Sequence, residues 1–211
     1  VEDAPAGIAD FILSNYQQNF LSKEHPELVE DVQSAVNSDA VFTPILGIYV
    51  MGSFGSISQT SASDLDIWIC HQDDLSEQDQ QRLAEKTKKI SLWASTFHVE
   101  MHFYLMTQKR FRNERYSDPL TKENSGSAQY MLLLEEFYRS AVRLSGKPLL
   151  WLHLWVEDEK QYEAEVARLV AEGELNPNDW VDFGGLGQFS ASEYFGASLW
   201  QLYKGIDSPY K

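Results

Sequence analysis

Residues 45–71, ILGIYVMGSFGSISQTSASDLDIWICH, contain two short apolar runs joined by a loop of small residues. The first run, 45–51, is continuously apolar and rich in β-branched and aromatic residues, which favours a buried strand. A second strand is predicted over 64–70, where Asp64 and Asp66 stand two positions apart. Because side chains alternate along a strand, both aspartates face one side while the apolar residues between and after them enter the core.

Two carboxylates on one face of a strand repel each other, so one would take up a proton unless a cation lies between them. Oxygen ligands suit Mg²⁺ or Mn²⁺, whose coordination is completed by water and substrate phosphates. Glu100, in a third strand predicted over 98–106, is the candidate third carboxylate, and His102 shares its face and competes with it. The alternative is a solvated or capping pair of aspartates, which is common in acidic chains.

A glycine–serine pair opens the loop between the first two strands. Gly52 lets the backbone approach a ligand closely, and a turn that leads into a helix directs free N–H groups outward. Gly52 and Ser53, with Ser63 at the end of the loop, are therefore the candidate substrate-binding residues on this side, suited to the oxygens of a triphosphate.

Composition narrows the class of protein. The 211 residues are 43% apolar, enough for a sizeable core, and carry a formal charge of −15, which opposes binding to DNA or RNA. Cys70 is the single cysteine, so an intramolecular disulfide is impossible, and we expect it to pack in the core. No apolar run approaches the ~18 residues of a membrane span. We predict no nucleic-acid partner, no transmembrane segment and a cytoplasmic location.

The fold class is predicted as α+β, a small mixed sheet flanked by helices and followed by a helical C-terminal part. We divide the chain into an N-terminal helical segment (1–44), a catalytic core (45–146) and a C-terminal part (147–211) that we expect to continue in a longer protein. Patterning outside the three strands predicts the following elements: helices over 5–21, after Pro26, over 76–97, 127–145 and 158–172 and from Ser190, and a polar linker over 107–126.

Three basic residues are candidate phosphate ligands. Arg112 lies in the polar linker, where clustered basic residues would form a lid over a triphosphate; the alternative is a solvated loop. Lys204 and Lys211 lie near the C-terminus, where they would contact the β- or γ-phosphate or simply remain surface lysines.

The spacing hG-S-x10-D-h-D-h, followed by h-E-h, resembles the signature of the nucleotidyltransferase superfamily that includes DNA polymerase β. A longer resemblance runs from Ile45 to Lys211, and residues 1–44 match no motif. Three blocks are similar to the catalytic region of the class I bacterial adenylate cyclases: MGSFGSISQTSASDLDIWICHQ, MLLLEEFYRSAVRLSGKPLLW and LNPNDWVDFGGLGQFSASEYFGASLWQLYKGIDSPYK. This resemblance implies a polymerase-β-like core that converts ATP into 3′,5′-cyclic AMP and pyrophosphate.

The resemblance also implies roles for individual residues. Gly52 and Ser53 would bind phosphate, Asp64 and Asp66 would bind two Mg²⁺ or Mn²⁺ ions, and Glu100 would be a metal ligand or help to deprotonate the ribose 3′-hydroxyl. It further implies a longer protein with a regulatory region that responds to the sugar phosphotransferase system. Two other functions stay open: transfer of a nucleotide to a small-molecule or protein hydroxyl, and a nucleotide-sensing module with an inactive site.

Overall fold

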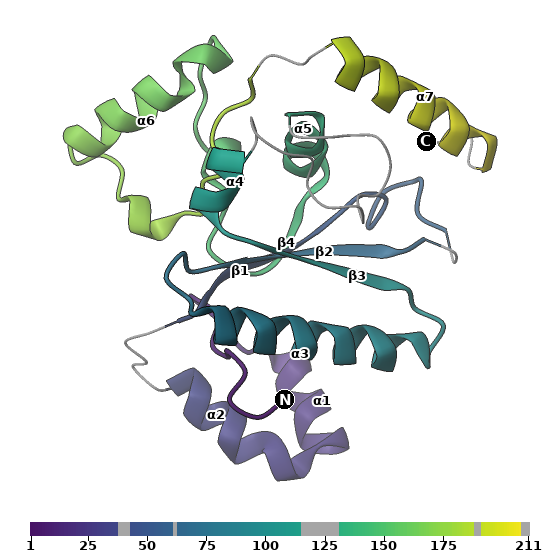
Figure 1. Cartoon of the computed structure of the whole chain (residues 1–211). Helices are drawn as coiled ribbons and strands as arrows, with labels where there is room; N and C mark the ends of the chain where they lie inside the picture. The colour runs from purple at the N-terminus through teal and green to yellow at the C-terminus, as the bar shows by residue number, and fades with distance from the viewer. Residues whose placement is uncertain (38–42, 61–62, 115–130, 188–190, 208–211) are drawn as a thin grey trace.

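A mixed sheet of four strands lies at the centre of the computed structural model (Figure 1). The structure describes residues 1–37, 43–60, 63–114, 131–187 and 191–207. The strand order is β3-β2-β1-β4; β1 is antiparallel to β2 and β4, and β2 is parallel to β3. The strands are β1 (Ile45–Met51), β2 (Leu65–His71), β3 (Met101–Met106) and β4 (Val142–Gly146). The three predicted strands are confirmed, although β3 begins three residues later than expected.

Helix α3 (Glu77–Ser95) makes the crossover that two parallel strands require, and it covers one face of the sheet. Leu83 of α3 packs with Ile67 and Ile69 of β2 in an aliphatic cluster. The predicted start of this helix is confirmed, because the Ser76 hydroxyl accepts a hydrogen bond from the Asp79 N–H at 3.1 Å.

Helix α5 (Met131–Ser140) covers the opposite face with an aromatic core. The rings of Trp68 and Phe137 stack with their centroids 4.1 Å apart, and Tyr49 meets Phe137 edge-on at 5.7 Å. Phe183, far along the chain, packs edge-on against Trp68. The core therefore continues from the sheet into the C-terminal part of the chain.

The helix predicted over 127–145 is wrong in its last part, because α5 ends at Ser140 and residues 142–146 form β4. Residues 142–146 pair with the edge of β1, which satisfies the backbone N–H and C=O groups of that edge. This long-range pairing outweighs the local helix propensity on which the prediction was based. Gly146 makes this pairing possible: its φ is +86°, and a Cβ there would lie 2.5 Å from the Leu46 carbonyl oxygen.

The helix predicted over 5–21 is wrong in its first half. Helix α1 (Asn15–Glu24) begins after Ser14, which forms a capping box with Gln17. Ile8 instead forms an isolated parallel bridge with Ile45 at the start of β1, so backbone pairing prevails over the helical spacing of the apolar residues. The second predicted helix is confirmed as η1 (Pro26–Leu28) followed by α2 (Val29–Asn37).

The polar linker predicted over 107–126 contains a helix, α4 (Gln108–Glu114), which forms because its buried Phe111 packs against Trp68. The rest of this linker lies outside the described residues. The later elements are η2 (Leu150–Leu152), η3 (Glu159–Gln161), α6 (Tyr162–Ala171), η4 (Pro177–Asp179) and α7 (Ala191–Asp207), which confirm the predicted helices over 158–172 and after Ser190.

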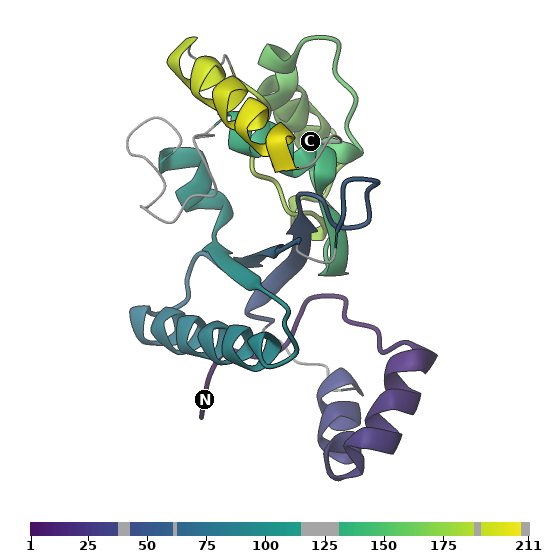
Figure 2. The ribbon, with the colours of Figure 1, turned by 90° about the vertical axis from the view of Figure 1, so that its right-hand side faces the viewer.

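Figures 1 and 2 show the layers: α3 lies on one side of the sheet with α1 and α2 beyond it, and α4, α5, α6 and α7 lie on the other side. The α+β class, with a small mixed sheet flanked by helices, is confirmed. Within the described ranges, no helix combines the length and apolar character needed to cross a membrane.

Candidate active site

The two aspartates lie where β2 begins, and Asp66 is on the face that α5 covers. Asp66 pairs with Met51 of β1 and with His102 of β3, and Asp64 immediately precedes the strand. Two residues further along, Trp68 occupies the same face and stacks on Phe137 of α5. The aromatic core thus ends at a partly exposed pair of carboxylates.

The glycine–serine turn is adjacent to Asp66. Gly52 has a φ of +89°, and a Cβ built on it would lie 3.9 Å from Asp66 Oδ2. Its N–H donates to Ser140 Oγ at 3.1 Å, and the Ser140 hydroxyl donates to the Glu136 carbonyl at 2.7 Å. The last turn of α5 therefore holds the start of the loop beside the carboxylate.

The two candidate serines of the loop, Ser53 and Ser63, take part in hydrogen bonds within the loop. The Ser53 carbonyl accepts from the Ser56 N–H at 3.0 Å and from the Ser56 hydroxyl at 2.8 Å. Ser63 Oγ accepts from the Thr60 N–H at 2.9 Å. Each of these bonds joins residues only three positions apart, and the predicted contacts of Ser53 and Ser63 with substrate stay predictions.

The entrance of β3 brings Glu100 to the same end of the sheet. Its carbonyl accepts from the Leu65 N–H at 2.9 Å, so Glu100 lies next to Asp64 across the parallel pair. The Glu100 carboxylate is 73% exposed and lies 3.1 Å from His102 Nε2. Across the described part of the chain, no three His, Cys, Asp or Glu side chains are grouped closely enough to hold a metal. The three carboxylates are neighbours, but they do not converge here on one point.

Arg112 binds protein acceptors in this structure. Its guanidinium donates to the Asp182 carboxylate, to the Asp182 carbonyl at 3.3 Å and to Glu163 Oε2 at 3.1 Å. Arg112 thus ties α4 to α6 and to the chain segment after it, and its predicted contact with a triphosphate stays a prediction. The side chain of Lys204, on α7, and the whole of Lys211 lie outside the described residues.

Two residues that the sequence analysis did not select as candidates, Tyr104 and Ser140, also contact the site. The Tyr104 hydroxyl donates to Asp66 Oδ1 at 3.4 Å; strand alternation places Tyr104 on the face of Glu100 and His102, and this pattern could have identified it. Ser140, which holds Gly52, gave no such indication, because it fell inside a helix predicted to run on to residue 145.

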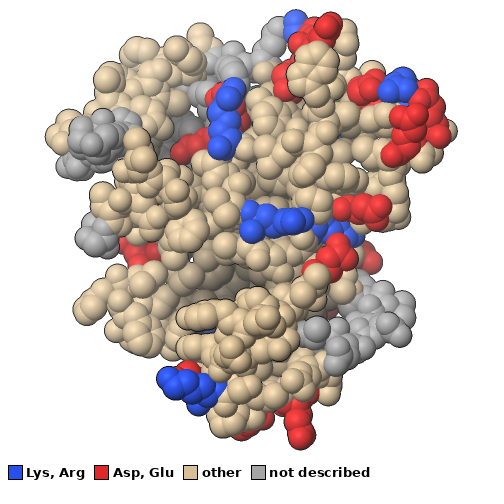
Figure 3. Space-filling view, turned by 180° about the vertical axis from the view of Figure 1, so that it is seen from behind, with Lys and Arg blue, Asp and Glu red and all other residues tan. Residues whose placement is uncertain are grey.

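Burial favours the uncharged forms of Cys70 and His71, the last two residues of β2. Burial raises the pKa of the Cys70 thiol, so Cys70 packs in the core as predicted and carries no charge there. Burial also lowers the pKa of His71. On the face drawn in Figure 3, the described Lys and Arg side chains are scattered, several of them beside Asp or Glu, and form no continuous basic stripe.

The fold and the site define a class of protein: an α+β domain with two neighbouring aspartates beside a glycine turn. The sequence comparisons identify the family within this class. The family model described as "Adenylate cyclase NT domain" matches residues 1–152, and the one described as "Adenylate cyclase, class-I, second domain" matches residues 189–211. The chain belongs to the family of class I adenylate cyclase N-terminal domains.

Relatives named adenylate cyclase match almost the whole chain. The Haemophilus influenzae protein is 70% identical over 213 residues, which cover 99% of this chain and 25% of that protein. The Pasteurella multocida protein is 62% identical, covering 100% and 25% respectively, and an Escherichia coli O157:H7 protein is 44% identical, covering 99% and 24%. The chain therefore spans about 25% of the length of these relatives.

Among solved structures, a crystal structure of a toxin–antitoxin with AMP-PNP is similar to this chain, with 16% sequence identity and a TM-score of 0.28. The matched region covers 74% of this chain and 86% of the chain in that structure. This low TM-score adds nothing to the family assignment, which rests on the sequence matches.

Proposed function

We propose that this chain is the catalytic region of an adenylate cyclase that converts ATP into 3′,5′-cyclic AMP and pyrophosphate. The observation that carries the proposal is the position of Asp66, two residues after Asp64 and 3.9 Å from where a Gly52 Cβ would lie. Family membership supports it. The regulatory region and the cytoplasmic location concern the whole protein and stay predictions.

The reaction forms a bond between the ribose 3′-oxygen and the α-phosphorus, and it breaks the bond from that phosphorus to the oxygen of the leaving pyrophosphate. The 3′-hydroxyl gives up its proton, and Glu100 is the candidate group to help remove it, because its carboxylate is exposed and its backbone adjoins the start of β2, next to Asp64. The missing Cβ of Gly52 leaves room for the triphosphate next to Asp66. These residues accelerate the step mainly through position and electrostatics.

The donor set fits Mg²⁺ or Mn²⁺. Asp64 and Asp66 offer hard carboxylate oxygens at one end of β2, and a triphosphate beside Gly52 would bring the further oxygens that such ions require. When bound, the ions lower the pKa of the attacking hydroxyl and neutralise charge on the triphosphate. The Tyr104 hydroxyl restricts the Asp66 carboxylate through its hydrogen bond, so the orientation of that ligand is set partly from β3.

The full-length protein, incubated with ATP and Mg²⁺ or Mn²⁺ without an acceptor, is expected to form cyclic AMP and pyrophosphate in equal amounts. Asp64→Asn removes one carboxylate of the pair, so turnover should fall by about a hundredfold or more. Asp74→Asn is the matched control, because Asp74 is exposed beyond the opposite end of β2. Transfer of AMP to an added hydroxyl compound, or normal cyclic AMP formation by Asp64→Asn, would contradict the proposal.

A further inference from the structure

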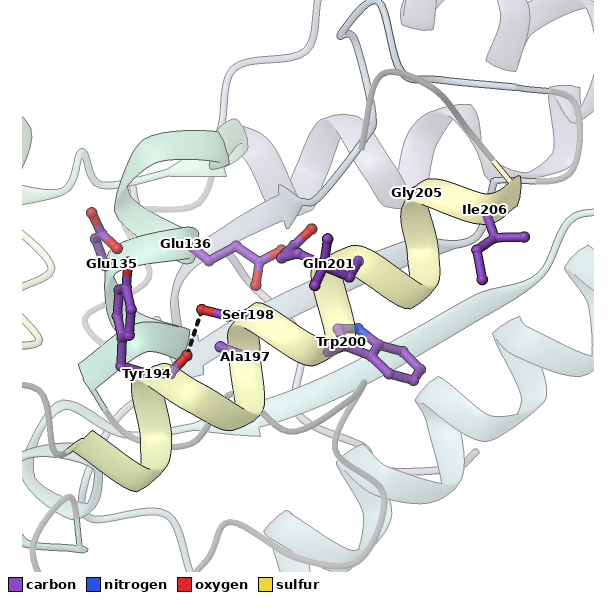
Figure 4. A pocket seen from close by; sticks show the side chains of 10 residues that line it. Glu135, Glu136, Tyr194, Ala197, Ser198, Trp200, Gln201, Gly205 and Ile206 are labelled. Atoms are coloured by element: carbon purple, nitrogen blue, oxygen red, sulfur yellow. Dashed lines mark hydrogen bonds between the residues drawn. The ribbon is translucent and has the colours of Figure 1, made fainter.

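A cavity of about 870 Å³ lies between α5 and α7 (Figure 4). Helix α5 contributes Glu135 and Glu136, and α7 contributes residues that include Tyr194, Trp200 and Gln201. In Figure 4 the Glu136 side chain reaches across the cavity toward Gln201. The volume falls in the usual range of small-molecule sites.

The cavity adjoins the candidate active site through one turn of α5. Glu136 lines the cavity, and its carbonyl accepts from the Ser140 hydroxyl, which in turn accepts from the Gly52 N–H. Glu136 and Ser140 are four residues apart, about 6 Å along a helix axis. A nucleotide spans at least this distance between its base and its phosphates, so one molecule can occupy the cavity and reach Gly52.

The chemistry of the lining selects the part of a nucleotide that fits. The Glu136 carboxylate disfavours phosphate groups through like charge, whereas Glu135 is paired with Arg139, whose Nε lies 2.6 Å from Glu135 Oε1. The half-buried Trp200 offers an aromatic surface, and its ring lies 5.5 Å from that of Tyr203 at 27°. Aromatic side chains stack on nucleobases, and a glutamine side chain pairs with the amino group and ring nitrogen of adenine.

We propose that this cavity is the base-binding site, in which Trp200 stacks on the adenine ring while Glu136 and Gln201 recognise its amino group. The inference rests on the adenylate cyclase function proposed above and names the residues that make it specific for adenine. Guanine presents an oxygen where adenine presents the amino group, so it meets the Glu136 carboxylate with like polarity and is disfavoured.

The test measures binding separately from turnover, using the full-length protein and the unreactive α,β-methylene analogues of ATP and GTP. Calorimetry should show that Trp200→Ala raises Kd for the ATP analogue about tenfold, because one stacking contact is lost, while Trp200→Phe retains most of the affinity. Glu136→Gln should reduce the preference for the ATP analogue over the GTP analogue by about tenfold. Trp93→Ala is the matched control, since Trp93 is an exposed tryptophan on α3, across the sheet, and should bind as the unmodified protein does.

The outcomes separate this inference from the proposed function. Cyclic AMP formation combined with unchanged analogue binding in Trp200→Ala and Gln201→Ala would overturn the base site and leave the cyclase intact. Loss of affinity in these variants without cyclic AMP formation by the unmodified protein would support the base site against the cyclase proposal. Gln201 is exposed, so its variant keeps the test decisive if Trp200→Ala does not fold.

Discussion

The two faces of the sheet differ in what they are made of and in what they do. Toward α3, β2 presents Ile67 and Ile69 to a compact aliphatic cluster. Toward α5, the same strand presents Asp66 and Trp68, an acidic group followed by an aromatic core. Alternation along one strand therefore gives both faces a packed core and places on the α5 face the acidic group that we assign to the candidate site.

The α5 face also contains buried hydroxyls that reach distant parts of the chain, whereas the buried Thr87 hydroxyl of α3 donates within its own helix, to the Ala84 carbonyl at 2.9 Å. The buried Tyr49 hydroxyl donates to the Lys147 carbonyl at 2.6 Å, and the Tyr138 hydroxyl donates to the Gly184 carbonyl at 2.7 Å. Buried hydroxyls need such partners, so this face depends on contacts with distant parts of the chain.

The largest expected difference between the faces is catalytic. Asp66→Asn removes a carboxylate from the functional face, so cyclic AMP formation by the full-length protein should fall by about a hundredfold or more. The melting temperature should stay the same or rise, because repulsion with Asp64 is relieved. Turnover assays and thermal unfolding measure the two effects, and near-normal activity would show that Asp66 is not a catalytic ligand.

Substitution of Ile67, the residue after Asp66, should instead reduce stability and leave catalysis intact. Ile67→Ala empties a buried position of the aliphatic cluster, so the free energy of unfolding should fall by about 2–5 kcal/mol. The folded fraction should keep its turnover at low temperature, since Ile67 points away from the site. Chemical denaturation measures the loss, and a large activity defect without destabilisation would mean that the faces are not separate.

Much of this contrast was predictable from the sequence. The apolar run 45–51 and the alternation around Asp64 and Asp66 depend on local patterns, and both strands appear where predicted. Strand β4 and the bridge between Ile8 and Ile45 were not predictable in this way, because their structure comes from pairing with β1. The contact of Ser140 with Gly52 likewise joins residues far apart in sequence, and no local pattern marks it.

Ser140→Ala should give a smaller, mixed effect. It leaves the Gly52 N–H without its hydroxyl partner, which should reduce stability by about 1–3 kcal/mol. The loop is then held less firmly beside Asp66, so KM for ATP should rise a few-fold more than kcat falls. Ser145→Ala on β4 is the control, and equal effects of both variants on KM would argue against positioning by Ser140.

The smallest expected effect is the pH dependence contributed by His71. Burial lowers its pKa more than the neighbouring Gln72 carbonyl raises it, so the folded protein resists protonation. Above the unfolded value of about 6.5 the residue is neutral in both states; below it only the unfolded chain gains the proton, and stability falls. As the pH falls from about 7.5 to 5.5, the urea concentration at the midpoint of unfolding should decrease less in His71→Gln than in the unmodified protein. His25 is exposed, and His25→Gln should show the same decrease as the unmodified protein.

The short pairing of residues 7–9 with β1 has a practical consequence for anyone who shortens the protein. The Ile45 N–H donates to the Gly7 carbonyl at 3.2 Å, and the Ile45 carbonyl accepts from Ala9 at 2.8 Å. A truncated version starting at Ile45 would strip both partners from a buried residue, at about 1–3 kcal/mol for each group. Lys86 also donates to the Pro5 carbonyl at 3.1 Å, so a trimmed protein should keep everything from Pro5 onward.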